Sequence, residues 1–197
     1  NNFFSLELAL ELRKKYGPAQ FITSHNACAH IDNLLDVIKG VKHCLDEHGV
    51  FVLEVGYLVE VYNNTWFDTI YHEHLDFHTV APFEKLFSRI GMEVISVECI
   101  SPQGGSIRVM AQKRGGKFKR DNSVDRLINL EHKLGLDKAE TFYKFDKKIR
   151  LVREKLNKLV CKLKDQGKTI AGFGAPTKAT TLMAHFGLDE KVLDFIV

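Results

Sequence analysis

The side chains best suited to chemistry lie in the stretch Tyr71-His72-Glu73-His74, directly after Phe67-Asp68-Thr69-Ile70. Histidine titrates near neutral pH, a carboxylate can orient or charge it, and a phenol can donate to a developing oxyanion. Such a row of side chains is typical of a site that moves a proton. A polar turn whose histidines cap an adjacent helix is the alternative explanation of the same four residues.

A second candidate segment lies near the end of the chain, over residues 168–178. It is expected to form a strand, the glycine turn Gly172-Phe173-Gly174 and the start of a helix. Such a turn directs free backbone N–H groups and a helix N-terminus at an anion, and Lys178 could add a point charge. A tight strand-to-helix turn without a ligand is the alternative.

A metal-binding module is a competing interpretation of the histidines. His72 and His74, with His78 four residues later, could ligate zinc or iron. No carboxylate or cysteine partner recurs at ligand spacing elsewhere, so the sequence predicts no metal site in this chain. The four cysteines lack CxxC spacing, which indicates a reduced, cytosolic protein.

The composition excludes several classes of protein. The chain has 197 residues, of which 45% are hydrophobic and 27% charged, enough for one domain and part of another. The net charge of +3 is too small to predict a nucleic-acid partner, and no apolar run approaches the length that spans a membrane. The chain starts at Asn1 rather than at Met, and we expect it to be an internal piece of a longer protein.

The first half of the chain predicts a strand–helix–strand unit. A helix over residues 4–16 precedes a strand over residues 20–24. Asp32 is the expected N-cap of the next helix, which is predicted to continue to about His48 and to end at Gly49. Residues 50–55 are apolar except for one Glu, as in a strand that is buried on both faces of a parallel sheet.

The second half predicts a hairpin followed by helices. Residues 56–80 are expected to be irregular, and residues 82–90 to form a short helix. Strands over 92–100 and 106–112 read as an antiparallel pair. Residues 113–117 are the expected domain boundary. A helix over 122–135 and a long helix capped by Asp137 follow, and the narrow apolar stripe of the long helix suits helix–helix packing.

Residues 20–112 resemble the second half of a class I S-adenosylmethionine-dependent methyltransferase, in which a hairpin supplies one antiparallel strand. The resemblance implies an α/β fold that consists of the second half of a class I methyltransferase Rossmann-like sheet, a helical connector and the start of a second Rossmann-like domain. The domains expected from it are 1–113, 114–167 and 168–197.

Three motifs carry a narrower resemblance, to sugar C-methyltransferases that act on nucleotide-linked 4-keto-deoxyhexoses. They are Phe67–His74, Gly104–Val109 and Gly172–Pro176. Their order and spacing agree with that family, and the resemblance covers nearly the whole chain. Two departures affect the expected substrate contacts. Thr177-Lys178-Ala179-Thr180 stands where the family usually has Ala-Lys-Gly-Asn, and Gln103 stands where relatives often have His.

The resemblance implies S-adenosylmethionine as cofactor and a nucleotide-linked sugar as substrate, and it does not specify an oligomeric state. The family usually begins with a cysteine-rich zinc domain and a glycine-rich cofactor loop. Both would lie outside this chain, so we expect zinc only in that domain, and we expect this chain by itself to be inactive and to bind the cofactor poorly. A methyltransferase acting on oxygen or nitrogen and a non-catalytic interaction domain are the alternatives.

The resemblance also implies roles for individual residues. His74 would be the base that removes a proton next to the ketone, and Glu73 and Tyr71 would complete the proton-handling group. His30 would lie near the sugar or the enolate oxygen, and Asn26 would contact the amino-acid portion of the cofactor. The expected substrate contacts are Gly104, Ser106, Gly172, Gly174 and Lys178.

Overall fold

The computed structural model describes residues 2–197 and divides them into two compact units. The first unit comprises the chain up to Val59 together with Leu75–Asp137, and the second comprises Glu60–His74 together with Lys138–Val197. The division assigns the Tyr71–His74 stretch to the same unit as the C-terminal residues. Residues 113–117, the expected domain boundary, lie inside the first unit.

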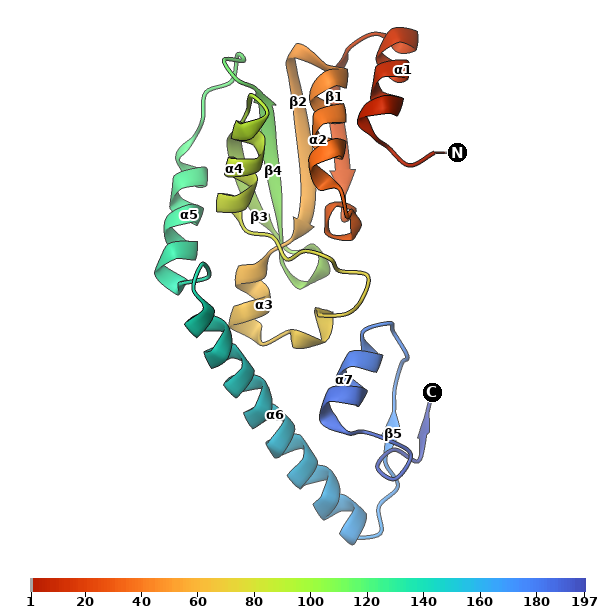
Figure 1. Cartoon of the computed structure of the whole chain (residues 1–197). Helices are drawn as coiled ribbons and strands as arrows, with labels where there is room; N and C mark the ends of the chain where they lie inside the picture. Colours follow the sequence, from red (N-terminus) through yellow and green to blue (C-terminus); the bar gives the residue numbers. More distant parts are fainter. Residues whose placement is uncertain (1) are drawn as a thin grey trace. The chain divides into compact units, whose positions relative to one another are not determined.

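The first unit contains a four-stranded sheet in the order β1-β2-β4-β3. β1 (Ala19–His25) and β2 (Leu45–Gly56) are parallel, while β4 (Ser106–Lys113) is antiparallel both to β2 and to β3 (Met92–Ile100). The hairpin therefore inserts its second strand between β2 and β3 (Figure 1). This confirms the α/β fold and the single antiparallel strand expected for the second half of a class I methyltransferase sheet.

Two helices cover one face of this sheet. Figure 1 shows α2 (Leu34–Cys44) in front of β1 and β2, and α4 (Val80–Arg89) in front of β4 and β3. Phe83 and Phe87 of α4 are buried, and the ring of Phe87 meets that of Phe51 on β2 with centroids 6.3 Å apart. Burial of such aromatic side chains supplies much of the stability of an α/β layer.

The end of α2 differs from the prediction. The helix is capped by Asn33 rather than Asp32, and it ends at Cys44, so that Gly49 lies within β2 instead of closing the helix. The reason is a distant side chain. Nη1 of Arg13 donates to the backbone oxygens of His43, Cys44 and Leu45, which satisfies carbonyl groups that a helix C-terminus leaves without partners. Arg13 belongs to α1 (Leu6–Tyr16), which the sequence did predict.

Residues 56–80 are more regular than expected. They contain α3 (Leu58–Asn64) and the 3₁₀-helix η2 (Phe67–Thr69). Short 3₁₀ turns are frequent connectors and carry little sequence signal. Two more 3₁₀-helices are present: η1 (Cys28–His30) follows β1, and η3 (Pro102–Gly104) joins β3 to β4.

The helices after the sheet begin at different caps. α5 (Asn122–Leu134) is capped by Asp121 and ends at Gly135 in the left-handed conformation, as expected for a C-terminal glycine. α6 (Ala139–Asp165) follows Lys138, and Asp137 is not its cap. The Asp137 carboxylate instead lies 3.4 Å from Nδ1 of His132, and this contact draws it away from the first turn of α6.

The end of the chain forms a small strand–helix–strand unit. β5 (Ala171–Gly172) pairs in parallel with β6 (Phe195–Ile196), and α7 (Ala179–Phe186) connects them. β5 confirms the strand expected within residues 168–178 but is only two residues long. Within residues 2–197, none of the helices combines the length and the apolar character needed to cross a membrane.

Candidate active site

His74 is held by its own neighbours in a single tautomer. Its Nδ1 lies 2.8 Å from the carbonyl oxygen of Thr69. A carbonyl oxygen can only accept a hydrogen bond, so Nδ1 carries the proton and Nε2 carries the lone pair. Nε2 lies 3.3 Å from the hydroxyl of Tyr71, which donates to it. The imidazole therefore presents a basic nitrogen beside a phenol, which is the arrangement expected of a general base with an acidic partner.

The other two members of the stretch point elsewhere. The side chain of His72 is 81% exposed, and its Nε2 is 4.0 Å from Oε1 of Glu73. The side chain of Glu73 is half-exposed. The structure therefore brings His74 and Tyr71 together and pairs the Glu73 carboxylate with His72. The role of Glu73 in proton handling stays a prediction.

The residues that lead into the Tyr71–His74 stretch contact helix α7 and the residue that precedes it. The ring of Phe67 stacks on that of Phe186 with centroids 4.9 Å apart, and both residues are buried. Nζ of Lys178 lies 3.5 Å from Oδ2 of Asp68. No local pattern in the sequence indicates this pairing, because the two segments are separated by more than a hundred residues.

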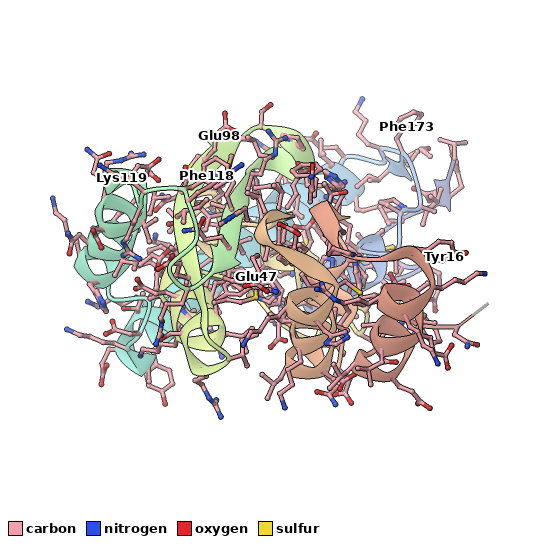
Figure 2. All side chains as sticks on the ribbon, turned by 90° about the horizontal axis from the view of Figure 1, so that it is seen from above. Tyr16, Glu47, Glu98, Phe118, Lys119 and Phe173 are labelled. Atoms are coloured by element: carbon pink, nitrogen blue, oxygen red, sulfur yellow. The ribbon has the colours of Figure 1, made fainter. Side chains whose placement is uncertain are left out.

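The glycine turn after β5 is already partly bonded. The N–H group of Gly174, which has a φ of 82°, donates to the backbone oxygen of Val197 at 2.6 Å. A Cβ atom at Gly172 would lie 3.2 Å from Cγ1 of Ile196, so glycine there permits β5 and β6 to approach. The side chain of Phe173, which lies between Gly172 and Gly174 in the sequence, is 95% exposed (Figure 2). A contact of Gly172, Gly174 or Lys178 with an anion stays a prediction.

The end of β1 lies in the first unit. Asn26 has a φ of 49°, a left-handed conformation that Asn tolerates, and its N–H group donates to the backbone oxygen of Glu54 at 2.8 Å. His30 ends η1 and is exposed. Both residues line a cavity of about 750 Å³ with largely apolar walls that include Cys28 and Phe51. Carboxyl ends of parallel strands are where such sheets bind ligands.

The turn of the hairpin folds back on itself. Gly104 ends η3 with a φ of 84°, and the hydroxyl of Ser106 donates to the backbone oxygen of Pro102 at 3.0 Å. Ser106 is 1% exposed. Its hydroxyl therefore stabilises the turn, and a contact of Gly104 or Ser106 with substrate stays a prediction.

A ladder of charged residues crosses the sheet at the level where β1 ends. His25, Glu54, Arg108 and Glu98 are paired in register on β1, β2, β4 and β3. Nη2 of Arg108 lies 3.0 Å from the buried carboxylate of Glu54, and Nη1 lies 3.3 Å from Glu98 on the outer strand. Glu54, the lone Glu in an otherwise apolar strand, is the sequence signal that could have indicated this ion pair, since a buried charge requires a partner.

His78 is a further residue that sequence reasoning placed only as a metal ligand. It is 7% exposed, and its ring stacks on Phe83 with centroids 4.7 Å apart. Burial lowers its pKa, while the Asp76 carboxylate and a hydrogen bond to the Cys28 backbone oppose that change. Among the described residues, no group hydrogen-bonds its Nε2. No set of three or more His, Cys, Asp or Glu side chains in residues 2–197 is arranged to hold a metal ion.

Comparison with known proteins identifies related sequences. Residues 101–197 match the family described as the C-methyltransferase C-terminal domain. The C-methyltransferase NovU of Streptomyces niveus is 33% identical over 192 residues, which cover 98% of this chain and 46% of NovU. The chain thus spans less than half the length of this curated relative.

Solved structures share part of the arrangement. A SAM-dependent methyltransferase from Anabaena variabilis aligns with a TM-score of 0.43 and 15% identity, over 56% of this chain and 55% of that one. The magnesium protoporphyrin IX methyltransferase from Synechocystis, solved with bound SAH, aligns with a TM-score of 0.40 and 12% identity, over 50% of this chain and 46% of that one.

Proposed function

We propose that this chain belongs to the C-methyltransferase family and is part of an S-adenosylmethionine-dependent enzyme that methylates a carbon atom of a nucleotide-linked keto-deoxysugar. The reaction proceeds through removal of a proton next to the ketone. The observation that carries the proposal is the geometry of His74, whose Nδ1 is held by Thr69 so that Nε2 is the basic atom.

The proton transfer assigns distinct tasks to His74 and Tyr71. Nε2 of His74 takes the proton from the carbon beside the carbonyl, and the electron pair of that C–H bond forms the enolate. The Tyr71 hydroxyl, 3.3 Å from Nε2, turns to donate to the enolate oxygen. The Glu73 carboxylate favours the positive charge that the imidazole gains. The enolate carbon would then take the methyl group of the cofactor, whose bond to sulfur would break with the electron pair left on sulfur, and the ketone would be restored.

We place the cofactor site in the first unit. When bound, S-adenosylmethionine supplies an electrophilic methyl group. The cavity of about 750 Å³ at the end of β1 is lined mainly by apolar surface and by a few polar side chains, which fits an adenosyl and amino-acid ligand. Asn26 would contact the amino-acid portion, and His30, exposed beside it, would lie near the sugar.

The nucleotide is proposed to bind at the glycine turn of the second unit. Lys178 supplies positive charge for the diphosphate next to the first turn of α7. Gly172 and Gly174 shape the turn, and Gly104 and Ser106 are proposed to shape the sugar site. Cys28 and Cys44 are buried thiols, and we place the protein in a reducing compartment such as the cytoplasm.

Replacement of His74 tests this function, in the enzyme at its full natural length. We expect His74→Asn to lower methyl transfer about 100- to 10,000-fold while cofactor affinity stays nearly unchanged. His72→Asn is the matched control, because His72 is exposed and two residues away. A His74→Asn enzyme that keeps more than about a tenth of the turnover contradicts the role. Transfer from a ¹³C-methyl donor followed by NMR must show the new methyl on carbon; a methyl on oxygen or nitrogen favours the alternative reaction.

A further inference from the structure

Four consecutive residues, Phe67–Ile70, join the candidate base to helix α7. Three of them contact α7 or the residue that precedes it: Phe67 stacks on Phe186, Asp68 meets Lys178, and the backbone oxygen of Ile70 accepts from Oγ1 of Thr181 at 3.2 Å. The fourth, Thr69, accepts from Nδ1 of His74. The Thr69 carbonyl group, which fixes the tautomer of His74, therefore has residues on both sides of it in the sequence that contact α7 or the residue before α7.

Helix α7 is itself well held within the second unit. Nδ2 of Asn157, on α6, donates to the backbone oxygen of Phe186 at 3.0 Å, and Phe186 is 2% exposed. The segment that leads to η2 also packs on α6, since the rings of Tyr62 and Phe145 lie 5.7 Å apart. A support of this kind can hold a loop within the few tenths of an ångström that catalysis requires.

The contacts differ in character on the two sides of Thr69. Nζ of Lys178 and the Asp68 carboxylate form an ion pair whose side chains are 50% and 23% exposed, so its strength falls with added salt. The hydroxyl of Thr181 makes a neutral hydrogen bond of defined direction. The hydroxyl of the adjacent Thr180 is bonded to the oxygen of Thr177, one turn earlier, and does not reach η2.

We propose that Thr181 and Asp68 are positioning residues for the methyl transfer proposed above. They fix the Thr69 carbonyl, and through it they keep the proton of His74 on Nδ1 and the lone pair on Nε2. This inference rests on the proposed function for its catalytic meaning. It goes beyond that function in assigning the orientation of the base to the C-terminal helix α7, more than a hundred residues away in the sequence.

The test compares Thr181→Val with Thr180→Val in the full-length enzyme. Valine keeps the shape of threonine and removes only the hydroxyl. We expect Thr181→Val to lower kcat about tenfold, because the His74 ring loses the support that the Thr181 hydroxyl gives through the Ile70 carbonyl. Thr180→Val is the control for the state of the His74 ring alone, because its hydroxyl bonds the Thr177 oxygen and Thr180 lies in the first turn of α7, where the diphosphate is proposed to bind. The ¹⁵N chemical shifts of the His74 ring, which distinguish the two tautomers, should show a mixture in Thr181→Val and a single form in the wild type and in Thr180→Val.

A second variant pair tests the ionic contact. Asp68→Lys should disturb the His74 tautomer, and the charge-swapped double variant Asp68→Lys/Lys178→Asp should restore it. The proposal is overturned if the ¹⁵N shifts of the His74 ring are the same in the wild type, in Thr181→Val and in Asp68→Lys. It is also overturned if the double variant departs from the wild-type shifts as much as Asp68→Lys does. The NMR measurement needs no substrate. If the shifts change as expected and the wild type transfers no methyl group, the proposed function fails and the positioning role stands.

Discussion

The hydroxyl of Tyr57 donates a 2.8 Å hydrogen bond to Oε1 of Glu131, across 74 residues of sequence. The same carboxylate accepts from the N–H groups of Val80 and Ala81, the first residues of α4. A carboxylate at a helix N-terminus satisfies donors that have no partner within the helix and is favoured by the helix dipole. Glu131 therefore joins α5, the first turn of α4 and the residue that follows β2.

Loss of Glu131 is expected to cost more than loss of Tyr57. Glu131→Ala removes the carboxylate that accepts from three donors, two of them in buried hydrogen bonds, and should lower the free energy of unfolding by about 3 kcal/mol, whereas Tyr57→Phe should lower it by about 1 kcal/mol. Urea denaturation followed by circular dichroism measures both. Tyr143→Phe is the control, because Tyr143 is 69% exposed. Equal losses in the two variants would show that Tyr57 is the main partner of the carboxylate.

The ion pair of Arg108 with Glu54 predicts a strong asymmetry between single and double variants. Arg108→Met removes the cation that lies 3.0 Å from the buried Glu54 carboxylate and leaves the half-exposed His25 ring 3.6 Å away, and we expect a loss of about 3 kcal/mol. Glu54→Met/Arg108→Met should recover most of that loss, because two apolar side chains replace the pair. Arg114→Met, at an exposed arginine, serves as the control. A double variant less stable than Arg108→Met would contradict the pairing.

The buried His78 predicts a loss of stability in mild acid. Its pKa in the folded state lies below the ordinary value of 6.5, so the unfolded chain binds the proton more readily. Stability is therefore complete above about pH 6.5 and falls as the pH drops towards the folded-state pKa. His78→Phe preserves stacking on Phe83 and removes the titration, so its urea midpoint should depend less on pH. His72→Asn should behave as the wild type does; an unchanged pH dependence in His78→Phe would contradict this account.

Lys178 and Asp68 are expected to affect nucleotide binding in opposite directions. Lys178→Ala should weaken the binding of a nucleoside diphosphate about tenfold, and the difference should shrink at high salt. Asp68→Asn should strengthen binding, since it removes a negative charge 3.5 Å from Nζ and frees the lysine for phosphate. Calorimetric titration of the full-length enzyme measures both, and Lys168→Ala, in the same unit, is the control. Weaker binding in Asp68→Asn would show that the carboxylate itself helps to hold the nucleotide.

The sequence by itself determined the elements whose signals are local. The hairpin strands, the end of α5 at Gly135 and the glycine turn before α7 follow from alternation, from residues that permit positive φ and from helix periodicity. The Tyr71–His74 stretch also stood out as candidate chemistry from residue types alone. Each of these signals lies within a few residues of the structure that it predicts.

Only the tertiary structure decided how distant residues share a hydrogen-bonding group. Arg13 ends α2 thirty residues away, Glu131 caps α4, and residues 60–74 belong to the same compact unit as α6 and α7. The proton on Nδ1 of His74 is set by Thr69, whose own neighbours are held by α7. None of these pairings leaves a trace in the local pattern, because a carbonyl or carboxylate takes its partner from whichever side chain the folded chain brings within 3 Å.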